Sequence, residues 1–151
     1  MIIAIDPGIS TGWCHITPAG ILACGRGEDF IPSAWGQKEL TAVIEDQEVY
    51  PQTPASQANN LITLAHRVGR YQERLESRGI PTTLVLPKLW KGQVKKPVHH
   101  ARMYTKLTSV ERKVVDAVTS KIPEKATEDV LDAVCLALWK LGRLPKSGQS
   151  T

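Results

Sequence analysis

The chain has 151 residues, of which 42% are hydrophobic and 23% are charged, and its formal net charge is +4. This length and composition are typical of one globular domain with a sizeable core. They exclude a membrane-spanning protein, because no apolar run approaches the ~20 residues of a span, and the first apolar run lacks the basic start of a signal peptide. We therefore expect a cytoplasmic protein with no membrane partner and with three reduced thiols, Cys14, Cys24 and Cys135.

The chain opens with a short apolar run that ends at Asp6 and is followed by Pro7 and Gly8. Such a run predicts a strand buried on both faces, with Asp6 at its carboxyl end. We expect Gly8 and Gly12 to supply positive φ angles in the turn that follows. Strands at 13–16 and 21–25 would complete an antiparallel meander. Asp6 either opens a hydrogen-bonded turn or serves as a paired or coordinated carboxylate.

The apolar run at 40–45 repeats this pattern and ends at Glu45, after a loop predicted over 27–38. If this strand lies parallel to the first and beside it, Glu45 and Asp6 emerge at the edge where open α/β sheets bind ligands. Asp46 and Glu48 compete for this role, and Glu45 is favoured as the first charge after the run. Tyr50, in the next loop, could stack on an exposed base or cover the edge of the core.

A long helix is predicted from the Thr53-Pro54 start signal to Gly79. Its apolar face is wider than one sheet contact needs, so we expect it to form a subunit interface as well. The alternative is that the sheet covers the whole face. A last strand follows at 82–86.

The segment from Ser77 to Val110 contains no acidic residue. A stretch of one charge sign favours nucleic acid as a partner, the alternative being an ordinary solvated surface. Within it a helix is predicted at 98–107, and Thr108 with Glu111 forms a capping box that starts another. The candidate nucleic-acid-binding residues are Tyr50, Lys88, Lys91, Lys95, Lys96, His99, His100 and Arg102.

The last predicted helix has Thr127 as its cap and is apolar from Val130 to Trp139 except for Asp132. Glu128 and Asp129 in a first turn would suit the helix dipole. Asp132 has no such explanation, because a buried unpaired carboxylate is unfavourable. It lies one turn from both other acids, and a cation held between them would account for it.

Ordered motifs make this chain similar to the RuvC-like Holliday-junction resolvases, especially to their short phage and bacterial relatives. These motifs are Ile-Asp-Pro-Gly-x-x-Thr-Gly, Val-Ile-Glu, Trp-Lys-Gly-Gln-Val and Asp-x-x-Asp-Ala with a later Leu-Trp, and they span residues 2–141. The resemblance implies a ribonuclease H-like α/β fold, in which a mixed sheet is flanked by helices. It also implies one nuclease domain over 1–145 and a homodimer that nicks opposing strands of a four-way junction to leave 5′-phosphates. The polar residues 146–151 are expected to form a flexible tail.

The resemblance also assigns roles by position. Asp6, Glu45, Asp129 and Asp132 match the metal-binding carboxylates, and Lys91 matches a group that holds the scissile phosphate. The implied cofactor is Mg²⁺, replaceable by Mn²⁺, with two ions per site.

Two departures from the family pattern stand beside these assignments. The glycine-rich, lysine-containing stretch before the last helix is not evident. Position 129 is often His or Asn in short relatives, so Glu128 remains an alternative to Asp129 as the fourth ligand.

Two alternative functions also remain. One is a related nuclease acting on other branched DNA or structured RNA, and the other is a non-catalytic junction-binding protein.

Overall fold

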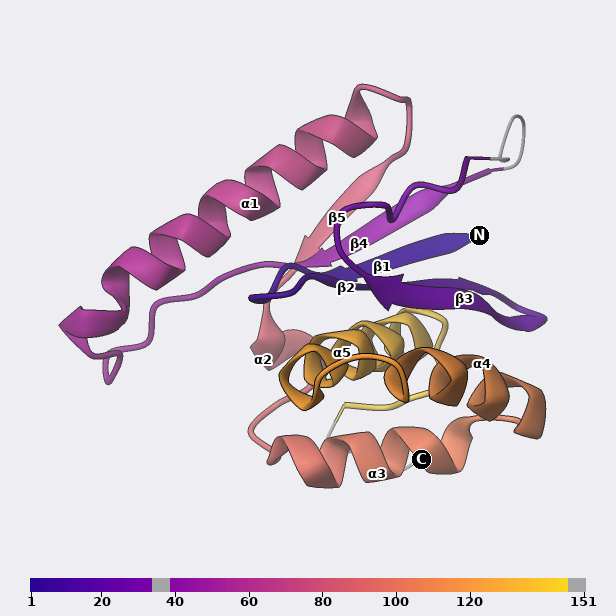
Figure 1. Ribbon diagram of the computed structural model, residues 1–151. Helices are drawn as coiled ribbons and strands as arrows, with labels where there is room; N and C mark the ends of the chain where they lie inside the picture. The colour runs from indigo at the N-terminus through magenta and orange to yellow at the C-terminus, as the bar shows by residue number, and fades with distance from the viewer. Residues whose placement is uncertain (34–38, 147–151) are drawn as a thin grey trace.

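A five-stranded mixed sheet forms the centre of the protein, and the computed structural model describes residues 1–33 and 39–146 (Figure 1). The strands are β1 (Ile2–Asp6), β2 (Gly12–Thr17), β3 (Gly20–Arg26), β4 (Thr41–Glu45) and β5 (Thr82–Val85). Their order is β3-β2-β1-β4-β5; β2 runs antiparallel to both of its neighbours, whereas β1, β4 and β5 are parallel. This order, with helices on both faces, is ribonuclease H-like and confirms the predicted fold class. The last five residues of the predicted loop at 27–38 and nearly all of the predicted tail lie outside the described residues.

Strand β1 is buried on both faces, as its uninterrupted apolar run predicts. Ile3 and Ile5 point into one core cluster, and Ala4, which lies between them, points into the other. All three are fully buried. The alternation of side chains along this strand therefore joins two separate cores, one on each side of the sheet.

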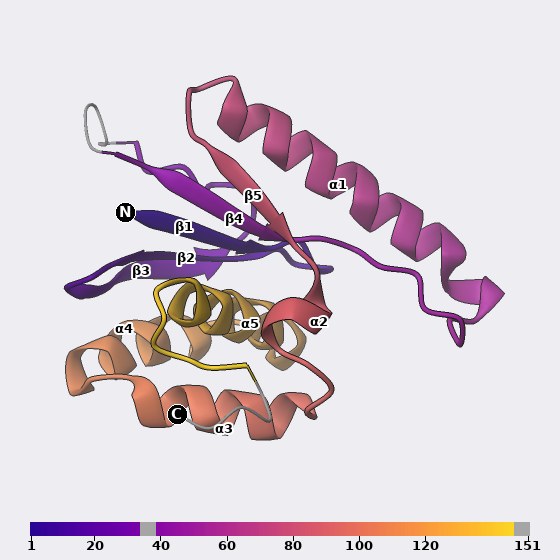
Figure 2. The ribbon, with the colours of Figure 1, turned by 180° about the vertical axis from the view of Figure 1, so that it is seen from behind.

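Helices cover both faces of the sheet, as Figures 1 and 2 show. Helix α1 (Ala58–Glu76), preceded by the 3₁₀ turn η1 (Ala55–Gln57), lies alone on one side. Helix α5 (Glu124–Lys140) packs directly against the other face, with α3 (Lys96–Lys106) and α4 (Ser109–Thr119) around it. The one-turn helix α2 (Pro87–Trp90) follows β5. Within the described ranges, no helix has the length and hydrophobicity that a bilayer span needs.

Only the C-terminal half of α1 packs on the sheet. Its buried residues are Val68, Tyr71 and Leu75, whereas Ile62 in the N-terminal half is 53% exposed. Figures 1 and 2 show the same division, because this helix extends past the ends of the strands. The wide apolar face predicted for α1 is therefore not covered completely by the sheet of this chain.

The predicted starts of two helices are wrong. Helix α5 begins at Glu124, after Pro123 in an extended conformation, and the Thr127 hydroxyl donates to the Pro123 carbonyl instead of capping the helix. Proline fixes φ and suits the start of a helix. Because the helix begins at Glu124, Glu128 lies in the second turn, so a favourable interaction with the helix dipole in the first turn does not explain it. Thr53 likewise does not cap α1, because its hydroxyl oxygen accepts from the Tyr50 N–H.

Two other local predictions are confirmed. At the start of α4, the Thr108 hydroxyl oxygen accepts from the Glu111 N–H at 3.2 Å, and the Glu111 carboxylate accepts from the Thr108 N–H at 2.8 Å. The cysteines Cys14, Cys24 and Cys135 are buried and free. Both features depend on local sequence and burial alone, which explains why they could be predicted.

Candidate active site

Parallel strand pairing brings the first two predicted acids together at one end of the sheet. Ile5 of β1 lies beside Ile44 of β4, so Asp6 and Glu45 leave the two strands at the same edge. Asp6 is 6% exposed and Glu45 is 7% exposed. The predicted adjacency of these strand ends is therefore confirmed.

Helix α5 carries two further acids to this edge. A Cβ built on Gly12 would lie 2.0 Å from the backbone carbonyl oxygen of Asp129, so the absence of a side chain lets the helix approach β2 this closely. Asp132 follows one turn later and is almost fully buried. The four acids line one cavity of about 370 Å³ that also contains residues of the basic segment.

The turn between β1 and β2 holds one oxygen of each of two acids. The Gly8 N–H donates to Asp6 Oδ1, and the Ser10 N–H donates to Asp129 Oδ2, both at 2.9 Å. Each carboxylate keeps its other oxygen for a further ligand, since no described residue donates to it. The turn thereby links the end of a strand to the helix that crosses it.

Glycines act in this turn in a different way from the one predicted. The residue with positive φ is Thr11, at 43°, and neither Gly8 nor Gly12 has this conformation. A Cβ on Gly8 would instead lie 2.3 Å from Asp129 Oδ1. The prediction of positive φ at the two glycines is wrong, because the sequence did not show that α5 passes so close to both.

Glu45 is held by two neighbours from the segment after β5. The Trp90 indole N–H donates to Glu45 Oε2 at 3.0 Å, and Lys91 Nζ lies 2.9 Å from Oε2 and 3.2 Å from Oε1. Proline at the first position of α2 favours the single helical turn that places both residues. Trp90 is fully buried, so this orientation of Glu45 is built into the core.

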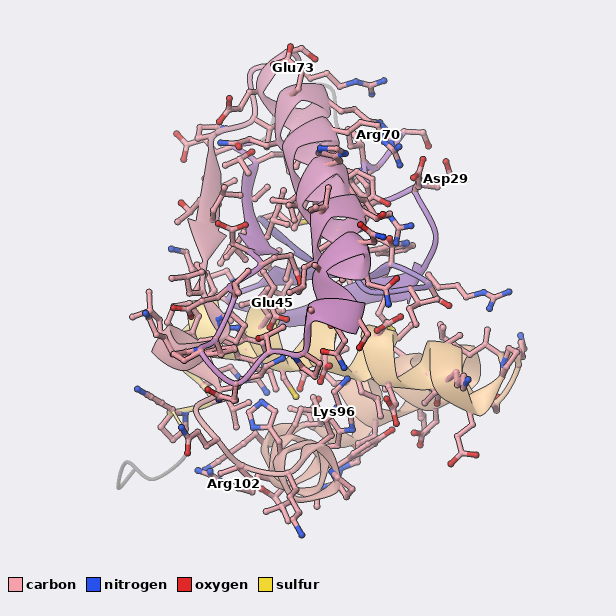
Figure 3. The ribbon with its side chains drawn as sticks, turned by 90° about the vertical axis from the view of Figure 1, so that its left-hand side faces the viewer. Asp29, Glu45, Arg70, Glu73, Lys96 and Arg102 are labelled. Carbon is pink, nitrogen blue, oxygen red and sulfur yellow. The ribbon has the colours of Figure 1, made fainter. Side chains whose placement is uncertain are left out.

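Asp132 is held by two residues of α3. His100 Nε2 lies 2.8 Å from Oδ1, and Lys96 Nζ lies 3.0 Å from Oδ2. Figure 3 shows Lys96 and Glu45 in the same region, between α1 and α3, with Arg102 farther away beside α3. The basic segment and the acidic cluster thus meet at one place.

The four acids differ in how well their charge is compensated. Burial, followed by the charges of Glu45, Asp132 and Asp129, raises the pKa of Asp6 well above its usual range. Burial also raises the pKa of Glu45, although Lys91 opposes the shift, and burial raises that of Asp129. Despite its burial, Asp132 has a lowered pKa because of its hydrogen bond with His100 and the charges of the two lysines. Asp6 is therefore the acid whose ionised form is least compensated by its surroundings.

The chemistry of these donors fits a hard divalent cation such as Mg²⁺ or Mn²⁺. Such cations prefer carboxylate oxygens, and a positive charge beside Asp6 would relieve the repulsion that raises its pKa. Among residues 1–33 and 39–146, no three His, Cys, Asp or Glu side chains are arranged in this structure as ligands of a metal ion. Lys91 and Lys96 instead pair with Glu45 and Asp132, and these long, partly exposed side chains can move away when a cation binds.

Most of the predicted nucleic-acid-binding residues lie around the acidic cavity. A second hollow, of about 810 Å³, is lined by Tyr50, Lys88, Gln93 and Lys146 and shares Lys91 with the acidic cavity. Tyr50 is 38% exposed. Lys95 precedes α3 and is exposed, whereas Arg102 on α3 is half-buried. A basic surface with one exposed aromatic ring therefore adjoins the acids.

His99 does not lie on this surface. It is 3% exposed, its ring lies 5.5 Å from that of Trp90 between centroids, and burial lowers its pKa to about 4. A buried side chain cannot reach a nucleic acid, so the prediction for His99 is wrong. Because adjacent residues of a helix point in different directions, His100 faces the acids while His99 faces the core.

Sequence reasoning missed three contributors to the site. Trp90 begins a recognised motif, but only its lysine was assigned a role there. Ser10 donates from its backbone, which no side-chain pattern reveals. Arg67 of α1 contacts carbonyl oxygens of the β1–β2 turn, and nothing in its neighbourhood in the sequence signalled this.

Comparisons with known proteins give results at the level of structure alone. No family model matches the sequence, and no curated protein matches it. Two solved structures of RuvC are similar. The structure of T. thermophilus RuvC in complex with a Holliday junction substrate has 15% identity and a TM-score of 0.44. A Thermus thermophilus RuvC structure has 16% identity and a TM-score of 0.45, and each match covers 95% of this chain and 98% of the other.

Proposed function

We propose that this protein is a metal-dependent endonuclease that cuts four-way DNA junctions, with a homodimer cutting two opposing strands. The observation that carries the proposal is the convergence of four carboxylates, from two strand ends and one helix, beside a segment that contains only basic charges. Acids that repel one another need a cation, and the lysines next to them suit a phosphodiester. The order of the motifs along the chain supports the choice of a junction as substrate.

In this proposal Asp6, Glu45, Asp129 and Asp132 hold Mg²⁺, with Mn²⁺ as a substitute and two ions per site. When bound, the cation would supply Lewis acidity that activates water and stabilises charge on the phosphate. Hydrolysis would then leave 5′-phosphate and 3′-hydroxyl ends. Lys91 moves from Glu45 to the scissile phosphate. Glu45 keeps its orientation during this exchange because its hydrogen bond with the Trp90 indole does not involve the lysine.

Asp129 is the better fourth ligand on structural grounds. Asp129 is 9% exposed, and its carboxylate accepts a hydrogen bond from the Ser10 N–H. The side chain of Glu128 is 54% exposed, and its only partner in the described part of the chain is Lys96, at 3.6 Å. A ligand is bound more tightly when it is already oriented, because less conformational entropy is lost on binding.

The DNA strand would follow the basic hollow that joins the acidic cavity at Lys91. Lys95 and Arg102 would contact phosphate oxygens around it, and so would Lys88 and Lys96 once they leave their partners Glu48 and Asp132. Tyr50 offers an exposed ring for stacking on an unpaired base, which is worth about 1–3 kcal/mol. His100 contacts Asp132 and therefore acts on the acids rather than on the DNA backbone in this proposal.

The homodimer would use the N-terminal half of α1. Leu61, Ile62 and Ala65 line an apolar hollow of about 430 Å³ together with Val49, which is 73% exposed. Exposed apolar surface of this kind marks an interaction site, and a two-fold contact between copies covers it on both.

Light scattering at micromolar concentration tests the dimer. We expect a dimer for the unmodified chain and a monomer for Ile62→Asp, whereas Thr63→Asp, at an exposed position outside the hollow, leaves the dimer intact. A monomeric unmodified chain, with and without junction DNA, would contradict this part of the proposal.

A panel of nucleic acids tests the substrate. The purified protein is incubated with a synthetic four-way junction, a linear duplex of the same sequence and a structured RNA, each with Mg²⁺ or with a chelator. We expect paired nicks in the junction alone, and only with Mg²⁺. Preferred cleavage of the RNA would point to the related ribonuclease, and tight junction binding without any nick would point to a non-catalytic protein.

A further inference from the structure

We propose that Arg67 is the positioning residue of this site. It lies on α1 and touches none of the four acids. It holds the turn of residues 7–11 so that two peptide groups of this turn orient Asp6 and Asp129. The consequence for metal binding rests on the proposed function, whereas the effect on the turn itself does not.

The guanidinium of Arg67 donates hydrogen bonds to three carbonyl groups of the turn. Its Nη1 lies 2.6 Å from the Gly8 carbonyl oxygen, 3.2 Å from that of Pro7 and 3.5 Å from that of Ile9. Hydrogen bonds from a charged donor are stronger than those from a neutral donor. A single charged group on α1 is therefore hydrogen-bonded to three successive carbonyl groups of the turn.

Two of these peptide groups also bind the carboxylates. The Pro7 carbonyl and the Gly8 N–H belong to one peptide group, and this N–H donates to Asp6. The Ile9 carbonyl and the Ser10 N–H belong to another, and this N–H donates to Asp129. A trans peptide group is planar, and its C=O and N–H point in opposite directions. A guanidinium that fixes the direction of the C=O therefore also fixes the direction of the N–H. Each N–H is thus directed at its acid by the Arg67 guanidinium behind it.

Other contacts also hold the turn: the Thr11 N–H donates to the Gly8 carbonyl oxygen at 3.1 Å, and the Gly27 N–H donates to the Ser10 carbonyl oxygen at 3.2 Å. Ile9 at its tip is 89% exposed, so the turn has little packing of its own. A second tether from α1 is the hydrogen bond between Tyr71 and Thr11 at 2.8 Å, which fixes the residue with positive φ at the end of the turn. Among the described residues, only Arg67 donates to the Pro7 and Ile9 carbonyls, which belong to the two peptide groups that face the acids.

The test compares Arg67→Met, which removes the guanidinium, with Arg67→Lys, which keeps the charge and some of the donors. Arg78→Met is the matched control, because Arg78 is exposed just beyond the end of the same helix and has no contact with the turn among the described residues. Amide hydrogen exchange at Gly8 and Ser10 is measured by NMR on the full chain without metal. The Asp46 N–H, which donates to the Val85 carbonyl at 2.9 Å, serves as the internal reference. Binding of Mn²⁺ by calorimetry provides the second measurement.

For Arg67→Met we expect exchange about tenfold or more faster at both amides, with unchanged exchange at Asp46. Mn²⁺ should bind about 10–100-fold more weakly, as for other residues that orient metal ligands. Arg67→Lys should recover part of both effects, and Arg78→Met should show neither. Unchanged exchange at Gly8 and Ser10 in Arg67→Met would overturn the proposal. If the unmodified chain binds no Mn²⁺, the proposed function fails, while the exchange rates still decide the role of Arg67.

Discussion

Replacing Gly8 by alanine gives a direct test of how closely the turn and α5 approach each other. A Cβ at this position would lie 2.3 Å from Asp129 Oδ1 and 2.7 Å from Cγ, whereas real Cβ contacts are essentially never shorter than 3.0 Å. The φ angle of Gly8 is outside the left-handed region, so alanine introduces no backbone strain there. The whole effect of Gly8→Ala therefore comes from the collision with the Asp129 carboxylate.

The size of the effect follows from what Asp129 loses when it rotates away. Its hydrogen bond from the Ser10 N–H involves a charged acceptor, and such bonds contribute about 1.5–3 kcal/mol. Alanine in place of glycine restricts the unfolded chain and returns about 0.4–1 kcal/mol. We expect the free energy of unfolding to fall by about 1–2 kcal/mol.

Urea unfolding of the metal-free protein measures this loss. Gly69→Ala is the control, because Gly69 lies inside α1 and a Cβ added there would meet no atom within 4 Å, and this change should stabilise the protein by up to about 1 kcal/mol. Gly8→Ala should also raise the Mg²⁺ concentration needed for nicking. The reasoning is refuted if Gly8→Ala is as stable as the unmodified chain and nicks DNA with the same Mg²⁺ dependence.

Three further predictions concern burial and charge. Glu111→Gln should lower the free energy of unfolding by about 3 kcal/mol at pH 7, because Arg143 and backbone N–H groups lower the pKa of Glu111 from 4.5 to about 2, and each pKa unit is worth about 1.4 kcal/mol. In the unmodified chain this stability is present above pH 4.5 and is lost as the pH falls toward 2, which urea unfolding across this range will show. Asp6→Asn should stabilise the metal-free protein. Because the pKa of Asp6 is raised in the folded state, the unmodified chain loses stability as the pH rises above the pKa of the unfolded state. The difference in the free energy of unfolding between Asp6→Asn and the unmodified chain should grow by about 1.4 kcal/mol per pH unit until the folded carboxyl ionises. An equal or lower midpoint for Asp6→Asn in urea at pH 7 would contradict this. Trp90→Phe removes the indole N–H that donates to Glu45. It should slow nicking at temperatures well below its midpoint of thermal unfolding, where the variant is still folded. Equal nicking rates for the variant and the unmodified chain would argue against this role.

The sequence contained enough information to place the acids at the strand ends. Asp6 and Glu45 each end an uninterrupted apolar run, and the physical rule that parallel strands share a carboxyl edge brings them together. Asp132 was detectable as the lone charge in a buried helix. These features could be predicted because each depends on local hydrophobic pattern, which the sequence displays directly.

The surroundings of the acids could not be predicted in the same way. Lys96 and His100 reach Asp132 because α3 packs beside α5, and Arg67 reaches the turn because α1 crosses above it. Such contacts depend on how helices pack, and helical periodicity does not determine this. The requirement for glycine at position 8 has the same origin, since the atom that would collide with a side chain belongs to a residue 121 positions later.

The central claim is that the four converging acids hold a cation that is needed to cut a phosphodiester. Its most direct test is the single-turnover nicking rate of a four-way junction in Mg²⁺ for the unmodified chain, Asp6→Asn and Asp132→Asn. Asp29→Asn, a change at an exposed acid outside the cavity, is the control. We predict that nicking disappears in both cavity variants and persists in Asp29→Asn. Full nicking by Asp6→Asn and Asp132→Asn would contradict the account.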